Sequence, residues 1–127
     1  MKILELNTFA GIGSTGRIAL DIARYAASRG DETIIGFGAG NAPPDAEVFA
    51  MRIGGKPGRK WHAMLRKFAD AEGYGSLAAT HRLIAFLKTW KPDVVHLHNL
   101  HGCYLNHAML FRYLKKTNIP VVWTLHD

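Results

Sequence analysis

Three of the chain's histidines are concentrated in one segment, KPDVVHLHNLHG at residues 91–102. A proline, two β-branched valines and the lack of a helical period predict a short strand that ends in a polar loop. Alternate strand residues point the same way, so His96 and His98 should share a face. We expect His96, deeper in the strand, to be structural, and His98, Asn99 and His101 to lie where a ligand could reach them. Titratable side chains at the carboxyl end of a buried strand are a common way for an α/β protein to build a site.

Clustered histidines can also bind zinc. No fourth ligand follows this segment at a fixed spacing, and histidines on strands also build hydrogen-bonded cores, so we expect no metal. Another histidine, His126, follows the apolar run PVVWTL and could donate a hydrogen bond to a ligand or move a proton near neutral pH. The alternative is a structural histidine in the core or at its rim, and this alternative applies more strongly to His96.

The loop NTFAGIGSTG at residues 7–16 carries Gly11, Gly13 and Gly16 in the pattern G-x-G-x-x-G. Such a loop can place backbone N–H groups at a helix N-terminus against a phosphate or another oxyanion. A dinucleotide fold also needs an acidic residue near the end of the second strand, where this chain has FGAG, so an NAD- or FAD-dependent oxidoreductase is disfavoured. The glycines could instead serve only to let the chain turn and the helix pack closely.

The elements that must position these residues alternate between strands and helices. We expect strands at 2–6, 32–37, 48–53, 94–98 and 120–125, and helices at 15–29, 59–71, 76–90 and 104–116. Ser14 or Thr15 should cap the first helix, and its inward face should carry Ile18, Ile22, Tyr25 and Ala26.

This order predicts an α/β fold, a Rossmann-like doubly wound parallel sheet with strand order 3-2-1-4-5. The switch point then lies between the first and fourth strands. The glycine loop, the histidine loop and His126 should therefore converge there.

Composition indicates one ordinary domain over residues 1–127, with 48% hydrophobic and 20% charged residues. Sixteen Lys and Arg against ten Asp and Glu give a net charge of +6, which suits a negative partner such as phosphate or an anionic lipid surface. Cys103 is the single cysteine, so no intrachain disulfide can form, and a reducing, cytoplasmic setting is expected. No apolar run approaches the ~20 residues of a membrane-spanning helix.

A basic, aromatic segment from Lys56 to Phe68 could lie peripherally on the inner membrane face. A packed helix with a solvated basic face is the favoured alternative for this segment. We expect no nucleic-acid partner, because no recognition motif is present. An open sheet edge at the fifth strand could pair with a second copy and give a homo-oligomer.

Three segments together resemble a known family: NTFAGIGSTGRIALDIARYAASRGDETIIGFG, KPDVVHLHNLHGCYLN and IPVVWTLHD. They are similar to the N-terminal domain of retaining glycosyltransferases of the GT-B type, group 1 (family 4), especially bacterial capsule and exopolysaccharide enzymes. The resemblance implies a hexosyltransferase that moves a sugar from a nucleotide-sugar to an acceptor hydroxyl with retention, in polysaccharide biosynthesis. The acceptor would be a saccharide or a lipid-linked molecule, and no cofactor is expected.

The resemblance also assigns roles to residues. His126 would reach the donor sugar and is the expected catalytic residue, and the glycine loop would line the cleft near the donor phosphates. His98, Asn99 and Gly102 would form the cleft floor, with His101 beside them. The nucleotide would be bound mainly by a C-terminal domain that is absent here. We therefore expect an acceptor-side part of a longer enzyme, inactive by itself; the alternative is a non-catalytic Rossmann-like module for a phosphorylated ligand.

Overall fold

The computed structural model of the chain describes residues 1–55, 64 and 76–126. Its strands are β1 (Lys2–Asn7), β2 (Glu32–Phe37), β3 (Ala50–Arg52), β4 (Val94–Leu97) and β5 (Val121–Trp123). Its helices are α1 (Gly13–Ser28), α3 (Leu77–Trp90) and α4 (His107–Thr117). The predicted helix at 59–71 and the basic segment from Lys56 to Phe68 lie outside the described residues, Met64 apart. Among the described helices, none is long and apolar enough to cross a membrane.

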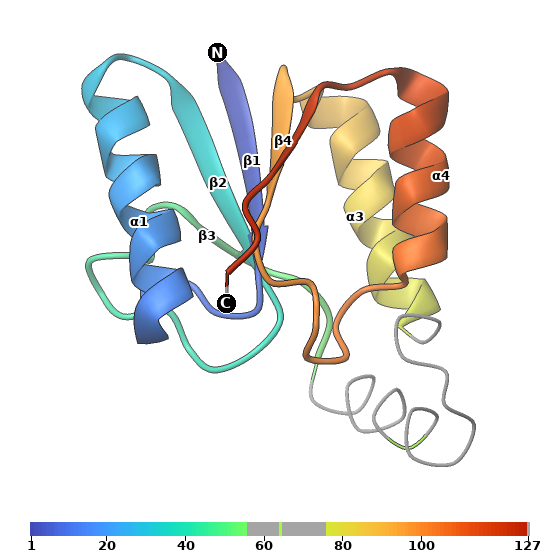
Figure 1. Cartoon of the computed structure of the whole chain (residues 1–127), viewed down its shortest axis with the longest axis horizontal. Coiled ribbons are helices and arrows are strands. Elements are labelled where there is room, and N and C mark those ends of the chain that lie inside the picture. Colours follow the sequence, from blue (N-terminus) through green and yellow to red (C-terminus); the bar gives the residue numbers. More distant parts are fainter. Residues whose placement is uncertain (56–63, 65–75, 127) are drawn as a thin grey trace.

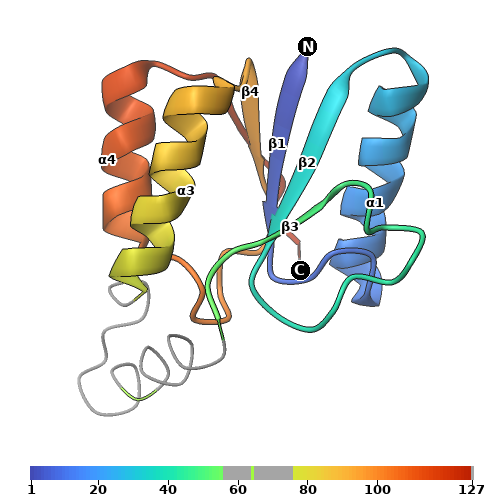
Figure 2. The ribbon, with the colours of Figure 1, turned by 180° about the vertical axis from the view of Figure 1, so that it is seen from behind.

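All five strands pair in parallel in the order β3-β2-β1-β4-β5, which confirms the predicted doubly wound sheet. Helix α1 covers one face, and α3 and α4 cover the other (Figures 1 and 2). Strand β1 is central, and its carboxyl end lies beside that of β4, at the lower edge of the sheet in Figure 1. The switch point is therefore where the sequence predicts it.

The two faces of the sheet differ in chemistry. Towards α3 and α4, the central strands bury leucines and valines, including Leu4, Leu6 and Val95. On the α1 side, Ile35 of β2 belongs to a small core with residues of α1. Its register partner on β1 is Glu5, and the register partner of Glu5 on β4 is His96. Polar groups are thus built into the α1 face of an otherwise apolar sheet.

Helix α1 packs through small residues. Its buried positions are Gly16, Ala19, Leu20, Ala23 and Ala26. The predicted inward face was wrong for Ile18, which is 42% exposed, and for Tyr25, which is 65% exposed. Small side chains let the helix approach the sheet closely, and this contact decides which face turns inward.

Helix α4 begins three residues later than predicted. Asn106 forms its N-cap, and the Asn106 side chain accepts a hydrogen bond from the Met109 N–H at 2.9 Å. Tyr104, expected inside the helix, is instead fully buried in the preceding loop. Its hydroxyl donates to the Asn99 carbonyl at 3.0 Å, so this tyrosine helps to hold the histidine loop in place.

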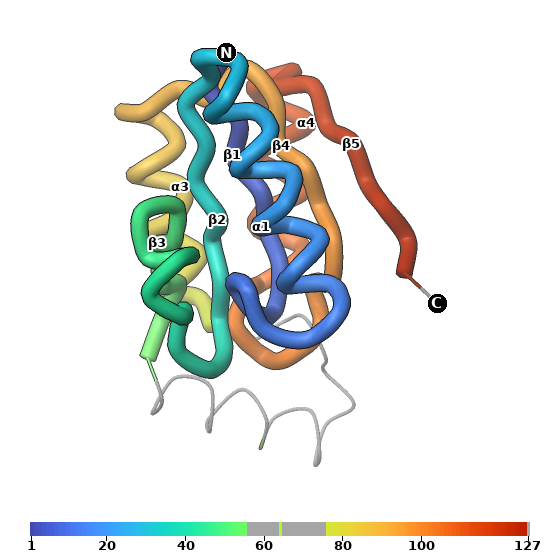
Figure 3. Tube along the Cα trace, turned by 90° about the vertical axis from the view of Figure 1, so that its left-hand side faces the viewer, coloured from blue at the N-terminus to red at the C-terminus, as the bar shows by residue number. Residues whose placement is uncertain are grey.

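Strand β5 is shorter than predicted and forms one edge of the sheet, opposite β3 (Figure 3). All three of its residues are exposed. The backbone N–H of Thr124, just beyond it, donates to the Leu97 carbonyl at 2.9 Å, and the Trp123 indole N–H donates to the His98 carbonyl at 3.1 Å. These bonds hold the end of the described chain against β4. Pairing of this edge with a second copy stays a prediction.

Candidate functional site

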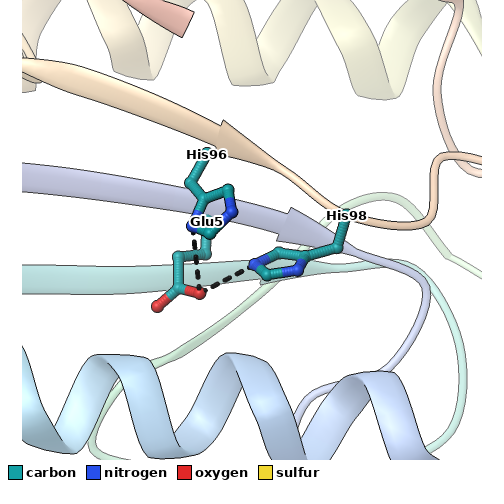
Figure 4. A group of neighbouring side chains, drawn as sticks. All are labelled: Glu5, His96 and His98. Atoms are coloured by element: carbon teal, nitrogen blue, oxygen red, sulfur yellow. Dashed lines mark hydrogen bonds and ion pairs between the residues drawn. The ribbon is translucent and has the colours of Figure 1, made fainter. Parts of the chain in front are cut away.

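A hydrogen-bonded row of three side chains crosses the sheet at the carboxyl ends of β1, β4 and β5. Glu5 Oε2 lies 2.9 Å from His98 Nε2, and His98 Nδ1 lies 3.0 Å from His126 Nε2. Glu5 and the His98 ring are fully buried, whereas His126 is half-buried. We call this row the Glu5–His98–His126 chain. It connects a carboxyl group in the core to a histidine at the rim (Figure 4 shows its inner part).

His96 flanks this chain on the same face of β4, as the alternation of strand residues predicts. The His96 and His98 ring centroids are 4.0 Å apart. His96 Nε2 forms a hydrogen bond of 2.8 Å with Thr124 Oγ1, and His96 Nδ1 faces Glu5 Oε2 at 4.0 Å. Both nitrogens of His96 are thus directed at groups inside the protein, which suits the structural role expected for it.

Burial decides the charge of this cluster. It raises the pKa of Glu5 to about 8, because a carboxylate there would have no water around it. Burial also lowers the pKa of His98, and it lowers the pKa of His96 to about 4 with a smaller contribution from the neighbouring His98 and His126. Although Glu5 and His98 lie at ion-pair distance, both are therefore neutral near pH 7. The carboxyl O–H donates to an imidazole nitrogen.

The second carboxyl oxygen of Glu5 supports this assignment. Glu5 Oε1 is buried and has no hydrogen-bond partner among the described residues. Leaving a charged carboxylate oxygen unpaired in the core would be costly, whereas an unpaired carbonyl oxygen of a neutral acid costs far less. A protonated Glu5 is the state that the geometry tolerates.

The same side chains could be considered as metal ligands, since candidate ligand atoms of Glu5, His96 and His98 lie within 4.8 Å of one another. Zinc bonds of about 2.0–2.1 Å in a tetrahedron would set ligand atoms about 3.3 Å apart. The observed separations of Glu5 Oε2 from the two histidine nitrogens are 2.9 Å and 4.0 Å. The first is a hydrogen-bond length and the second is too long, so a hydrogen-bonded cluster describes these residues better. That the site uses no metal stays a prediction.

The expected accessibility of His98 was wrong. Its side chain is fully buried, whereas the His96 side chain keeps 14% of its surface exposed. The reason is that His98 is enclosed between Glu5 on one side and His126 on the other. Of the three residues in the row, His126 is the one that is only half-buried.

The glycine loop turns back on itself. The Gly11 N–H donates to the Gly16 carbonyl at 3.0 Å, and Gly11 has φ +70°. A Cβ on Gly16 would lie 3.2 Å from the Phe9 carbonyl oxygen, so this glycine is needed for close packing. Gly13 also has positive φ, but a Cβ there would meet no atom of residues 1–55, 64 and 76–126 within 4 Å. Packing therefore explains Gly11 and Gly16, and leaves the space beside Gly13 open.

The start of α1 lacks the predicted cap. Its N-cap residue is Ile12, whose side chain makes no capping hydrogen bond. The prediction that Ser14 or Thr15 caps the helix was wrong because α1 begins earlier, at Gly13. The Thr15 hydroxyl instead accepts from the Asn7 side-chain amide at 3.3 Å and from that of Asn99 at 3.4 Å. Uncapped N–H groups in a first turn favour a negative ligand.

Asn7 joins the glycine loop to the histidine loop. Its Oδ1 accepts from the Asn99 N–H at 3.2 Å, and its Nδ2 donates to the Phe9 carbonyl at 2.8 Å. Asn99 is thereby fixed beside α1, as the predicted convergence requires. Sequence reasoning did not select Asn7 or Glu5. Both residues could have been selected from the predicted topology, because a polar side chain on a central strand of such a sheet is buried.

Thr8 forms a second link between the same loops. Its hydroxyl lies 2.7 Å from the His101 carbonyl oxygen, to which it donates. Gly102 has φ +108°, and a Cβ there would approach a Thr8 methyl group to 2.8 Å. The His101 residue is exposed, and its ring is not part of the Glu5–His98–His126 chain. A role for Asn99, His101 and Gly102 in ligand binding stays a prediction.

Comparison with known proteins bears on this arrangement. A family model described as Glycosyltransferase Family 4 matches residues 15–127, which include His98 and His126 but not Glu5. The chain is 27% identical over 137 residues to WcaC of Escherichia coli (strain K12), assigned as a colanic acid biosynthesis glycosyl transferase, and covers 33% of it. A solved structure of the spinosyn rhamnosyltransferase SpnG, complexed with thymidine diphosphate, matches 98% of the chain at 17% identity with a TM-score of 0.50. The chain spans about a third of the length of both proteins, and the second likeness shows the fold.

Proposed function

We propose a sugar-transfer function from one premise: the chain belongs to glycosyltransferase family 4. The full-length protein that carries it transfers a hexose from a nucleotide-sugar to an acceptor hydroxyl, with retention at the anomeric carbon. The likeness to WcaC supports a role in polysaccharide biosynthesis with a saccharide or lipid-linked acceptor. The observation that carries the proposal is that the histidine loop contacts both neighbours at the switch point of the sheet: His98 contacts His126, and Asn99 contacts Thr15 of the glycine loop.

In this proposal His126 is the catalytic residue of the chain. Its Nε2 is committed to His98, so Nδ1 is the nitrogen left for the donor sugar. The uncapped first turn of α1 supplies backbone N–H groups for the negative charge that develops on the departing phosphate. Asn99 is held by Asn7 and by Thr15 in the first turn of α1, and it is proposed to bind the substrate.

The chain supplies the acceptor side of the site in this proposal, and the rest of the donor site lies in the part of the relatives that the chain does not cover. Its residues are proposed to work in the cytoplasm, in keeping with a single cysteine that is buried. We expect the 127-residue chain alone to be inactive in transfer. The full-length product of the gene is therefore the protein to assay.

The test is His126→Ala in that full-length protein, with nucleoside diphosphate release and product formation measured over a panel of nucleotide-sugars. Loss of a positioned catalytic group predicts a fall in kcat of roughly 10²–10⁴-fold with the fold retained by circular dichroism. His81→Ala, at an exposed position of α3, is the matched control and should keep wild-type turnover. Unchanged turnover in His126→Ala would remove His126 from the site. Tight nucleotide binding without turnover by the wild-type protein would favour a binding module instead.

A further inference from the structure

We propose that Glu5 is a positioning residue whose proton sets the hydrogen-bonding group that His126 presents to its ligand. The inference rests on the proposed function in one respect only, namely that His126 faces a substrate. The device itself is a property of the Glu5–His98–His126 chain. Glu5 lies outside the region matched by the family model, so family membership assigns it no role.

The two hydrogen bonds of this chain must run in the same direction. Each neutral imidazole has one donor nitrogen and one acceptor nitrogen. His98 uses Nε2 towards Glu5 and Nδ1 towards His126, so its tautomer decides both bonds at once. With distances of 2.9 Å and 3.0 Å, neither bond can be left without its proton.

With Glu5 protonated, its O–H donates to His98 Nε2. His98 then carries its proton on Nδ1 and donates to His126 Nε2. His126 in turn carries its proton on Nδ1 and offers an N–H donor, which suits a sugar hydroxyl oxygen or a phosphate oxygen.

With Glu5 ionised, every bond reverses. His98 Nε2–H donates to the carboxylate, His126 Nε2–H donates to His98 Nδ1, and His126 Nδ1 becomes an acceptor. Passing between the two states moves one proton along each of the two hydrogen bonds. The net change is the loss of one proton. Glu5 passes its proton to His98, His98 passes one to His126, and His126 releases one from Nδ1 to solvent.

Few titratable groups in the described part of the chain lie close enough to Glu5 to affect its proton. On β4 the titratable groups facing it are His96 and His98, and beyond β5 there is His126. On β2 its register partner is the apolar Ile35. On α1 the titratable side chains Arg17, Asp21, Arg24 and Tyr25 are all exposed, and so is Arg29 at its C-cap. Among the described residues, only the neighbouring histidines therefore compete for this proton.

Burial raises the pKa of Glu5 to about 8, so the donor form of His126 predominates near neutral pH. This explains why a glutamate is tolerated at a central strand position that leucine would fill at lower cost. A carboxyl group kept neutral by burial is a fixed proton donor, and it selects one tautomer of a histidine that would otherwise hold both.

The test measures the tautomers directly. The chain, labelled with ¹⁵N in histidine and with ¹³C in the side-chain carboxyl of glutamate, is followed from pH 7 to pH 10 by long-range ¹H–¹⁵N correlation and by the carboxyl ¹³C signal. The histidine rings are assigned by single His→Gln variants, and the Glu5 carboxyl signal by Glu5→Gln. Wild type should show the His126 proton on Nδ1 at pH 7 and on Nε2 at pH 10. His98 should switch with the same midpoint, near that of the Glu5 carboxyl ¹³C signal. A His126 tautomer that stays constant while Glu5 titrates would overturn the proposal.

Glu5→Gln removes the titration with little change of shape, so His98 and His126 should keep one tautomer across the whole range. Glu47→Gln makes the same change at an exposed loop glutamate and should retain the switch. A switch that persists in Glu5→Gln would also refute the role of Glu5. Because this readout involves no sugar transfer, it is separate from the turnover test. A confirmed switch with normal turnover in His126→Ala would remove His126 from the catalytic site and leave the control of its tautomer by Glu5 in place, whereas a missing switch with lost turnover would reject the role of Glu5 alone.

Discussion

Replacing Glu5 by Gln should change how the stability of the chain depends on pH. In the folded chain Glu5 keeps its proton up to a pKa of about 8, whereas its ordinary value in the unfolded chain is 4.5. A raised pKa means that the folded state binds the extra proton. The stabilisation is complete below pH 4.5 and is lost as the pH rises through the folded value.

The magnitude follows from counting one proton. His96 and His98 have lowered pKa values in the fold and an ordinary value of 6.5, so they also make stability depend on pH in the lower part of this range, but equally in wild type and in Glu5→Gln. The difference between the two proteins therefore isolates Glu5, which holds up to one more proton in the folded than in the unfolded chain between pH 6.5 and pH 8. Relative to Glu5→Gln, the free energy of unfolding of wild type should fall by up to roughly 1.4 kcal/mol for each pH unit, or about 2 kcal/mol over this window. Glu5→Gln cannot lose this proton, so its contribution is absent.

The assay is urea unfolding followed by far-ultraviolet circular dichroism at half-unit steps between pH 6.5 and pH 8. The stability of Glu5→Gln relative to wild type should rise by about 2 kcal/mol across the window. The exposed-site variant Glu47→Gln should follow the wild-type curve. Parallel curves for Glu5→Gln and wild type would show that Glu5 is ionised throughout, and the assignment of a neutral Glu5–His98 pair would then fail.

Three further outcomes are expected. Gly38→Ala should cost at least about 2–3 kcal/mol of folding stability, because the added Cβ would lie 2.1 Å from Tyr104. Gly13→Ala should cost about 1–2 kcal/mol from its positive φ alone, because a Cβ there meets no atom of the described residues within 4 Å. Equal losses of stability in urea unfolding would contradict this. Dialysis against EDTA should leave melting temperature and transfer rate unchanged, and a loss restored by Zn²⁺ would reinstate a metal. In the full-length protein the kcat profile of wild type should bend near pH 8, and that of Glu5→Gln should not; a bend in both would assign it to another group.

The architecture could be predicted because it depends on patterns that burial enforces. Alternating strands and helices in a right-handed parallel sheet allow few strand orders, and the order 3-2-1-4-5 was confirmed. The details that failed depend on packing partners. The face of α1 was predicted from its largest apolar residues, but contact with the sheet selected the smallest ones, leaving Tyr25 exposed. The size and hydrophobicity of the side chains in a helix do not show how closely that helix can pack against the sheet.

The site was predicted in part for the same reason. His98 and His126 were brought together by topology, which the sequence carries, and their 3.0 Å contact bears this out. Glu5 was not selected from the sequence, where one polar residue between Leu4 and Leu6 gives no sign of a site by itself. In a doubly wound sheet the first strand is covered on both faces, so a polar residue there must be buried. Combining the predicted topology with the position of Glu5 would have identified it.

The pairing register of the strands fixes the relative positions of the three side chains in the Glu5–His98–His126 chain. Glu5 pairs with His96 across β1 and β4, which places His98 one inward-facing position further along, and the bonds of Thr124 and Trp123 to β4 hold the segment that leads to His126. A slip of one residue in β1 would turn Glu5 to the opposite face and break the chain entirely. The group that His126 presents is therefore fixed by backbone ladders of the sheet, whereas Asn99 and the glycine loop depend on side-chain bonds through Asn7 and Thr15. Substitutions of Asn7 should accordingly disturb the glycine loop while leaving the His126 tautomer unchanged.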